Sequence, residues 1–323
     1  MRIGGAGPEV SRIGLGTWAI GGGPAFGGAD GERRGAATIR AAPGLGVNLI
    51  DTAPGYNFGR SEEIVGAAIT GRRQDYVIVT KCGLVWDREG AFFSRVGDTV
   101  LNRRLDPESI EQEVDASLQR LATDYIDIYM THWPAVEPFS TPISQTVECL
   151  MRLKSSGRIR GIGAANVSSA QVREYLAHGD LDIVQMRYSI LDRTVEEDLL
   201  PTCLENGIVV QAYSPLEMGI LAGAVPRGYV PEPGSAREGK KWFEPARLER
   251  ALDMLDAWRP LCDKYGCAAA DLAIAWILHQ DPGVAVLSGS TSPDQLRQNV
   301  RALAIDLSEQ DALWMREYAE RIG

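Results

Sequence analysis

The chain has 323 residues, of which 45% are hydrophobic and 24% charged, so it is long enough to bury a large core. Its 43 acidic and 33 basic residues give a formal net charge of -10, which argues against nucleic acid or an anionic membrane as the main partner, because both bind basic surfaces. No stretch is apolar for the length of a signal peptide or a bilayer span, so we expect neither export nor membrane insertion.

Short runs rich in valine and isoleucine recur along the chain, with helix-period segments between them. Runs of this kind are typical of parallel strands that are buried on both faces. The predicted strands cover residues 12–18, 47–51, 76–81, 125–132, 159–166, 182–188, 208–213 and 284–289.

The segments between these strands carry helix signals. Asp106 is a capping residue before Pro107 at the first helical position, and an apolar stripe follows. The pairs at 141–142 and 292–293 repeat this pattern, and the second is placed to form a capping box with a glutamine. We expect Pro43 to kink or end the first helix. Further helices are predicted over residues 32–45, 61–69, 170–177, 196–205, 248–265 and 308–323.

Eight strands that alternate with helices predict a single α/β domain over residues 1–323, a (β/α)8 TIM barrel of parallel strands. A doubly wound open sheet is the alternative, and it would carry a glycine-rich phosphate turn after its first strand. The glycine run at 21–23 lacks the G-x-G-x-x-G spacing, which favours a flexible loop. Long loops at 83–105 and 214–245 follow the third and seventh strands, on the side where barrel enzymes build their sites.

Polar residues stand at the carboxyl ends of several predicted strands, which is typical of a barrel active site. Each residue alone is more often a helix cap, a solvated group or a structural one. Together, and with Tyr56 on the loop after the second strand, they converge on one rim. The residues are Asp51, Lys81, His132, Asn166, Gln185 and Tyr213, from the second to the seventh strand.

Four of these residues suit hydride transfer to a carbonyl. Hydride addition develops negative charge on the carbonyl oxygen, which needs a proton donor. Tyr56 offers a hydroxyl, and we expect the ammonium of Lys81 to lower its pKa below the ordinary value of about 10. Asp51 is expected to hold Lys81, while His132 hydrogen-bonds the carbonyl oxygen. His132 itself is the alternative proton donor.

The same residues lie in segments that resemble the aldo-keto reductase family. NLIDTAPGYNFGRSEEIVG resembles its Asp–Tyr motif, VTKCG its lysine strand and DIYMTHWP its histidine strand. IGLGTW, RIRGIGAAN, VQMRYS, QAYSPL and GSTSPDQLRQN extend the resemblance over essentially the whole chain. The resemblance implies a (β/α)8 oxidoreductase that uses NAD(P)(H), with Asp51, Tyr56, Lys81 and His132 as its catalytic tetrad.

The resemblance also implies the residues that bind the cofactor. Asn166 and Gln185 match the positions that hydrogen-bond the nicotinamide carboxamide, and Tyr213 matches the aromatic residue that stacks on its ring. The other implied contacts are Thr17, Trp18 and Asp51 near the nicotinamide ribose and pocket, Ser214, Pro215 and Leu216 at the pyrophosphate, and Gly289, Ser290, Thr291, Ser292, Gln295 and Asn299 around the adenosine phosphate and adenine.

Two positions depart from the family pattern. Ala165 stands where the family usually has a serine, which removes one hydrogen bond to the carboxamide. Thr291 stands where many NADP-preferring members have arginine or lysine, the usual partner of the extra phosphate. The sequence therefore predicts a modest preference for NADP over NAD, and leaves NAD as the alternative cofactor.

The run WDREGAFFSRVGDTVLNRRL is longer than in compact members and resembles a bacterial branch that handles sugars, inositol-related compounds and small aldehydes. Trp86, Phe92, Phe93 and Trp133 are expected to line the pocket, although the two phenylalanines have the alternative role of anchoring the loop. The expected substrate contacts are Trp18, Tyr56, Trp86, His132 and Trp133.

Other assignments remain open at this point. A cofactor-binding regulatory subunit resembling potassium-channel β subunits is the second functional hypothesis. A metal-dependent barrel hydrolase is a distant third, because the chain has only 3 histidines and no cluster with ligand spacing, so no metal is expected. The 5 scattered cysteines contain no Cys-x-x-Cys pair and predict reduced thiols in the cytoplasm. A small molecule is the expected partner, and the oligomeric state is not predicted.

Overall fold

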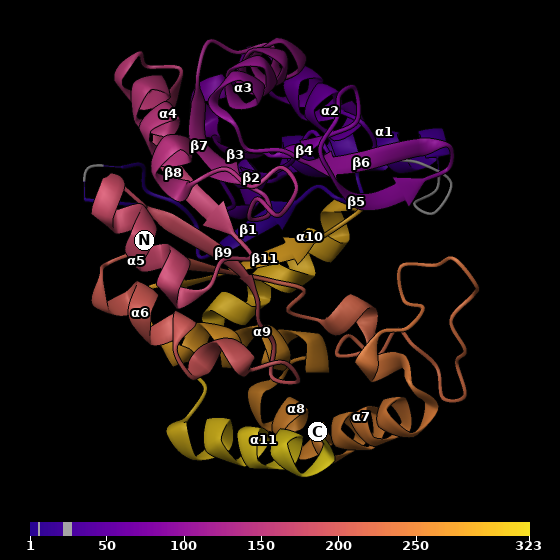
Figure 1. Ribbon diagram of the computed structural model, residues 1–323. Coiled ribbons are helices and arrows are strands. Elements are labelled where there is room, and N and C mark those ends of the chain that lie inside the picture. Colours follow the sequence, from indigo (N-terminus) through magenta and orange to yellow (C-terminus); the bar gives the residue numbers. More distant parts are fainter. Residues whose placement is uncertain (6, 22–27) are drawn as a thin grey trace.

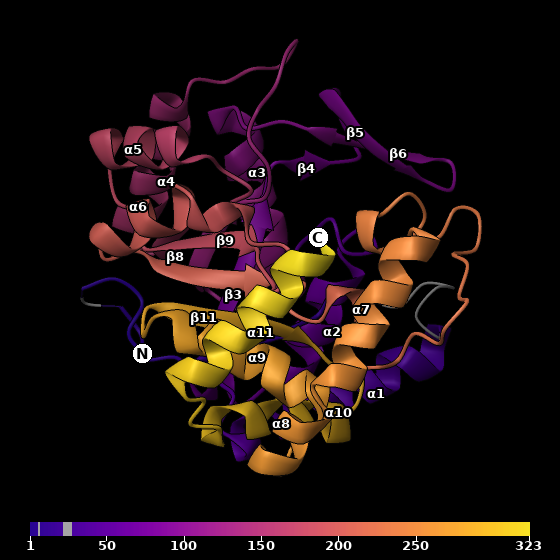
Figure 2. The ribbon, with the colours of Figure 1, turned by 90° about the horizontal axis from the view of Figure 1, so that it is seen from below.

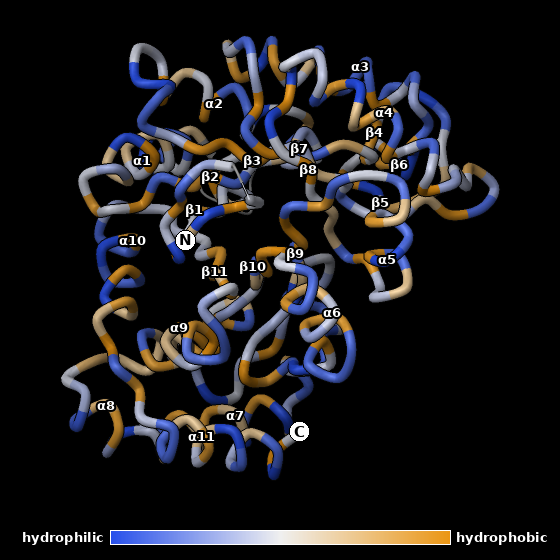
Figure 3. The backbone as a smooth tube through the Cα atoms, turned by 90° about the vertical axis from the view of Figure 1, so that its left-hand side faces the viewer, coloured by the Kyte–Doolittle hydropathy of each residue, from blue (hydrophilic) through white to orange (hydrophobic). Residues whose placement is uncertain are grey.

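The computed structural model describes residues 1–5, 7–21 and 28–323, so most of the glycine run at 21–23 lies outside the described residues. Within these ranges, eight parallel strands close into a barrel in the order β1-β11-β10-β9-β8-β7-β3-β2, which confirms the predicted fold (Figure 1). In Figure 3 their labels follow one another around a ring. The strands are β1 (Ile13–Gly16), β2 (Leu49–Asp51), β3 (Val77–Cys82), β7 (Ile126–Thr131), β8 (Ile159–Ala165), β9 (Ile183–Arg187), β10 (Val209–Tyr213) and β11 (Val284–Gly289).

Helices surround this barrel (Figure 2). Among the described residues, none of them has the length and apolar character needed to cross a bilayer. They are α1 (Gly28–Ala41), α2 (Arg60–Ile69), α3 (Pro107–Leu121), α4 (Ile143–Ser155), α5 (Ser169–His178), α6 (Leu199–Glu205), α7 (Pro245–Ala257), α8 (Arg259–Tyr265), α9 (Ala269–Gln280), α10 (Pro293–Val300) and α11 (Glu309–Ile322).

The helices agree with the prediction at Pro43 and differ from it at two other places. The first helix ends at Ala41, before Pro43, as the proline predicts. The single helix expected over 248–265 is divided into α7 and α8, because Pro260 has no N–H to continue the helical hydrogen bonds through Trp258. The sequence did not predict α9, since its residues are buried on nearly every side and form no amphipathic stripe.

The barrel interior is apolar at its amino end. Leu49 and Val77, at the starts of β2 and β3, belong to one buried cluster with Ile3 and Val10 of the N-terminal segment. This segment therefore packs against the amino ends of the strands. The carboxyl ends are left for polar side chains, as is usual for this architecture.

The strand register places polar residues together at the carboxyl edge. Asp51 pairs with Val79 and with Gly16, and Lys81 lies two residues farther along β3. On the opposite side of the barrel, Gln185 pairs with both Ala165 and Gln211. Parallel strands end at a common edge, so the barrel brings residues far apart in the sequence to one mouth.

The segment after β3 is more ordered than the predicted loop over 83–105. It forms an antiparallel sheet in the order β4-β6-β5, from β4 (Leu84–Val85), β5 (Ala91–Val96) and β6 (Thr99–Arg103). The prediction was wrong here because hairpin pairing, with Gly97 at a positive φ of 58° in the turn, supplies backbone partners that the pattern did not show. The segment over 214–245 is largely irregular, as predicted, apart from short 3-10 turns at Glu217–Gly219 and Lys241–Phe243.

Candidate active site

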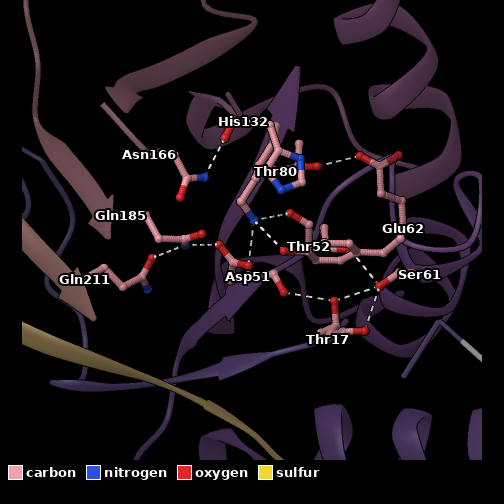
Figure 4. Close-up of polar contacts among 12 residues, drawn as sticks. Thr17, Asp51, Thr52, Ser61, Glu62, Thr80, His132, Asn166, Gln185 and Gln211 are labelled. Atoms are coloured by element: carbon pink, nitrogen blue, oxygen red, sulfur yellow. Dashed lines mark hydrogen bonds and ion pairs between the residues drawn. The ribbon is translucent and has the colours of Figure 1, made fainter. Parts of the chain in front are cut away.

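Lys81 lies at the centre of the polar mouth and is fully buried, as is Asp51. Its amino group donates to Asp51 Oδ1 at 2.7 Å, to the backbone oxygen of Thr52 at 2.9 Å and to the hydroxyl of Tyr56 at 3.2 Å (Figure 4). An ammonium has three protons, so all of them are used. The Tyr56 oxygen accepts one of these bonds, which leaves its own proton for another acceptor.

The charge states of this group follow from burial and neighbouring charge. Burial raises the pKa of Tyr56, and the charge of Lys81 offsets this only in part, so the pKa stays above its ordinary value. The expectation that Lys81 brings this pKa below the ordinary value is therefore wrong. Burial has the largest single effect on the pKa of Lys81 and lowers it, but the charge interactions and hydrogen bonds with Asp51 and Tyr56 together outweigh burial and leave that pKa raised. At neutral pH the site holds a charged amine beside a protonated phenol.

His132 follows β7 and faces Tyr56 edge-on, with 5.7 Å between the ring centroids. Burial, followed by the charge of Lys81, holds the pKa of His132 well below its ordinary value. The imidazole is therefore neutral at neutral pH. Its Nδ1 atom is buried without a hydrogen-bond partner in the described part of the chain. A neutral ring is a weaker acid than an imidazolium, which favours Tyr56 over the alternative donor His132.

The second carboxylate oxygen of Asp51 joins a buried amide pair. Gln185 Nε2 donates to Asp51 Oδ2 at 2.8 Å and to Gln211 Oε1 at 2.7 Å. The carboxylate is thus held by Lys81 on one oxygen and by Gln185 on the other (Figure 4). Sequence reasoning missed Gln211, although it stands two residues before Tyr213 and therefore shares its face of β10.

A second polar chain joins the ends of β7, β8 and β10. Tyr213 donates its hydroxyl proton to Asn166 Oδ1 at 2.7 Å, and Asn166 Nδ2 donates to the backbone oxygen of His132 at 2.9 Å. Asn166 has a positive φ of 58°, a conformation that asparagine tolerates better than most residues. The backbone therefore turns sharply where β8 ends, beside His132.

The two residues predicted at the end of β1 lie in different surroundings. Thr17 is fully buried, and its hydroxyl donates to the backbone oxygen of Asp51 at 2.9 Å and bonds Ser61 Oγ at 2.7 Å. Ser61 in turn bonds Thr52 Oγ1 at 2.8 Å. Thr17 thus holds the backbone on which Asp51 stands, whereas Trp18 is 48% exposed at the rim.

The residues predicted to hold the adenosine end surround the start of α10. Asn299 Nδ2 donates to Ser288 Oγ at 2.5 Å and to Ser290 Oγ at 3.0 Å. The backbone N–H of Thr291 donates to Gln295 Oε1 at 2.8 Å, while Gln295 N donates to Ser292 Oγ at 3.3 Å. The expected capping box is therefore incomplete, because the glutamine side chain binds Thr291 rather than the cap residue.

The predicted pyrophosphate side lies next to this helix start. β10 and β11 are neighbours in the barrel, so the segment after Tyr213 leaves the same edge as the one after Gly289. Ser214 has a positive φ of 56°, and Pro215 is buried while Leu216 is half-buried. The structure thus brings the two predicted parts of a dinucleotide site side by side.

The comparisons with known proteins agree with this geometry. Residues 12–320 match the Aldo/keto reductase family. The chain belongs to the aldo/keto reductase family. Family, barrel and oxidoreductase activity are therefore confirmed, and the enzyme hypothesis prevails over a purely regulatory subunit.

Relatives of the reductase cover nearly its whole length. It is 56% identical over 314 residues to the NADH-specific methylglyoxal reductase of Escherichia coli (strain K12). The alignment covers 97% of this chain and 96% of that relative. It is 39% identical over 293 residues to the aldo-keto reductase YhdN of Bacillus subtilis (strain 168), with coverage of 90% and 84%. Among solved structures, a glycerol dehydrogenase from Gluconobacter oxydans has a TM-score of 0.89 at 33% identity and covers 99% of this chain and 95% of its own.

The aromatic residues that follow β2, β3 and β7 pack against one another in two pairs. Trp86 packs edge-on against Phe58 at 5.6 Å between centroids, and Trp133 packs against Phe93 at 5.4 Å. Phe92 is 66% exposed, whereas Phe93 is half-buried, and its ring contacts Trp133. The pairing of β5 with β6 is irregular between Phe92 and Ser94, so Phe93 lies at a bulge of the small sheet. The sequence analysis did not include Phe58 among these aromatic residues, because it lies outside the loop expected over residues 83–105.

Proposed function

We propose that this reductase reduces a small aldehyde by transfer of a hydride from NADH, with Tyr56 as the proton donor. The observation that carries the proposal is the hydrogen bond from the buried amine of Lys81 to Tyr56, at 3.2 Å. The name of the Escherichia coli relative, an NADH-specific methylglyoxal reductase, supports both the cofactor and the substrate class.

The residues at the barrel mouth fit a nicotinamide. Asn166 and Gln185 offer amide groups that match the donors and acceptor of a carboxamide, and the half-buried ring of Tyr213 offers a face for stacking. Gln211 Nε2 is buried without an acceptor in the chain as described, so this amide cluster holds a donor that no protein group satisfies. When bound, the reduced nicotinamide supplies the hydride.

The start of α10 supports NADH over NADPH. Between residues 289 and 299 the sole cation of the sequence is Arg297, and it forms an ion pair with Asp294. Thr291 and Ser292 offer hydroxyl groups, which suit a ribose better than an additional phosphate. We therefore place NADH first, where the sequence predicted NADP with NAD as the alternative.

Proton transfer follows from the protonated phenol. Tyr56 donates its free proton to the carbonyl oxygen as negative charge develops there. Lys81 stabilises the phenolate that remains, and Asp51 keeps Lys81 charged and in place. His132 is neutral and donates a hydrogen bond that orients the carbonyl, a contribution that positions the substrate rather than protonating it.

The test compares the wild type with Tyr56→Phe and with Tyr318→Phe, a control on α11 outside the site. NADH absorbance is followed with methylglyoxal and other small aldehydes, and NADH binding is followed by quenching of protein fluorescence. We expect Tyr56→Phe to lose about 100-fold or more in kcat while NADH affinity changes little, because only the proton donor is removed. Near wild-type turnover by Tyr56→Phe would overturn the assignment of the donor.

We also propose that residues 1–323 act as one domain, because β1 and β11 from opposite ends of the sequence pair within the barrel. Cys82, Cys149 and Cys203 are buried free thiols, which supports a reducing compartment such as the cytoplasm. Measuring reduction with NADH and NADPH in parallel tests the cofactor, and a clear preference for NADPH would contradict the proposal.

A further inference from the structure

Arg103, at the end of β6, caps two aromatic rings at the edge of the candidate active site. Its guanidinium carbon lies 5.1 Å from the centroid of Phe93 and 5.0 Å from that of Trp133. The two rings are themselves in contact, 5.4 Å apart. We call Arg103, Phe93 and Trp133 the arginine–aromatic cluster. Such rings hold a guanidinium by cation–π attraction and leave its N–H groups for other partners.

The charge of Arg103 has no counter-ion in the described ranges of the chain, and no acceptor there takes a hydrogen bond from it. Two arginines of the same segment differ in this respect, since Arg88 pairs with Asp87 at 2.9 Å and Arg104 with Asp106 at 2.6 Å. Arg103 Nε is buried, and burial lowers the pKa of its guanidinium. A partly desolvated cation without a counter-ion is costly, and an anionic ligand would relieve that cost.

The strand register turns Arg103 toward the catalytic group. Arg103 pairs directly with Leu84 on β4, so the two side chains project from the same face of the small sheet. A Cβ placed on Gly55 would lie 3.4 Å from Leu84 Cδ1 and 4.0 Å from His132 Cε1, so Leu84, on this face, lies close to His132. Trp133, the second ring under the guanidinium, directly follows His132 in the chain. Figure 1 shows the sheet beside the barrel.

We propose that Arg103 binds an anionic group at the far end of the substrate, so that the preferred substrate is a small aldehyde bearing a carboxylate or a phosphate. The proposal rests on the function proposed above. The planar fork of a guanidinium accepts both oxygens of a carboxylate or phosphate, and the two rings limit its motion. Arg103 thereby acts as a specificity-determining residue, at a distance from the carbonyl that reacts.

The test uses pairs of substrates that differ in charge: 4-oxobutanoate with its methyl ester, and glyceraldehyde 3-phosphate with glyceraldehyde. They are measured on the wild type, on Arg103→Met, which keeps side-chain volume against the rings, and on Arg103→Lys. Arg95→Ala is the matched control, because Arg95 is an exposed cation of the same hairpin with only a backbone contact, at 3.4 Å to the oxygen of Asp98. The two pairs distinguish a carboxylate from a phosphate.

We expect the wild type to favour the charged member of at least one pair by about tenfold or more in kcat/KM. Arg103→Met should remove this preference, mainly through KM, and leave the neutral member within about twofold of the wild type. Arg103→Lys should retain part of the preference, because it keeps the charge and loses the fork, and Arg95→Ala should retain all of it. The inference about Arg103 would be overturned if the wild type reduced neutral aldehydes without favouring charged ones, or if Arg103→Met kept the preference. Either result would leave the proposed function in place.

Binding without turnover separates this inference from the proposed function. Calorimetric titration with 4-hydroxybutanoate and with inorganic phosphate should show saturable binding of one of these anions to the wild type. The same anion should bind about tenfold or more weakly to Arg103→Met. If that result holds while no aldehyde is reduced, the proposed function fails and the anion site stands. If neither anion binds differently to the two proteins, the anion site fails.

Discussion

The amino group of Lys81 lies 3.2 Å from the phenolic oxygen of Tyr56 and donates a hydrogen bond to it. The direction of this bond matters as much as its length. Because the phenol oxygen accepts from Lys81, its own proton is left for a different acceptor, and in the proposed mechanism that acceptor is the bound carbonyl. The amine is ready to stabilise the phenolate once the proton has moved.

The first prediction concerns pH. Burial raises the pKa of Tyr56 against the opposing charge of Lys81, so the phenol stays protonated through neutral pH. We expect kcat/KM for aldehyde reduction to be constant from about pH 6 to about pH 9 and to fall only as the pH rises through the pKa of Tyr56. Alcohol oxidation needs the phenolate and should rise over the same alkaline range. Initial rates in both directions check this, and a reduction rate that falls near the ordinary pKa of histidine would assign the proton to His132.

The second prediction concerns the ion pair of Asp51 and Lys81. Both side chains are fully buried, and Lys81 Nζ lies 2.7 Å from Asp51 Oδ1. Asp51→Asn leaves a buried ammonium without its counter-ion, which should cost about 3 kcal/mol in the free energy of unfolding. Asp87→Asn is the control, because Asp87 pairs with Arg88 near the surface and should lose less than about 1 kcal/mol. Urea denaturation measures both. Equal effects of the two substitutions would show that burial adds nothing to the pair.

The third prediction concerns Glu113 on α3. It accepts hydrogen bonds from the N–H of Gly83 at 2.9 Å and from the hydroxyl of Ser109 at 3.1 Å, and burial raises its pKa from 4.5 to about 8. The folded state therefore binds this proton more tightly than the unfolded chain. Its contribution to stability falls as the pH rises from the unfolded pKa to the folded one, and above that it is a constant cost.

Glu113→Gln should remove this cost. We expect the variant to exceed the wild type in free energy of unfolding by on the order of 3 kcal/mol at about pH 9, and to lie close to it at about pH 5. Glu108→Gln, on the exposed side of the same helix, should show no such difference. Urea denaturation at the two pH values measures the free energy of unfolding of each protein. If that free energy changed with pH in the same way for Glu113→Gln and for the wild type, the raised pKa of Glu113 would be contradicted.

The fourth prediction concerns the contact of α2 with α3. A Cβ on Gly66 would lie 2.6 Å from the backbone oxygen of Arg120 and 2.8 Å from the carbonyl of Leu121, so the helices approach too closely for a side chain. Gly66→Ala should destabilise the protein by about 1–3 kcal/mol, despite the better helix propensity of alanine. Gly44→Ala is the control, because no atom lies within 4 Å of its Cβ position. Thermal unfolding compares them, and a Gly66→Ala variant as stable as the control would show that the helices separate without cost.

Local patterns were enough to predict the barrel and most of the polar residues at its mouth. Buried apolar runs that end in Asp51, Lys81 and His132 contain both the strand and its polar residue within a few consecutive positions. The alternation of side chains along a strand and the effect of a proline on a helix both act over such short distances. The three residues do lie together at one mouth, and the early end of the first helix before Pro43 follows from the same local chemistry.

Tertiary structure decided what depends on contacts between distant segments. The hydrogen bond that Gln185 donates to Gln211, and the position of Arg103 over Trp133, join residues that no local pattern relates. The pKa of Tyr56 is the clearest case, since its direction depends on whether burial outweighs the charge of Lys81. Burial is a property of the packed chain, and it is set only when the barrel closes around these side chains.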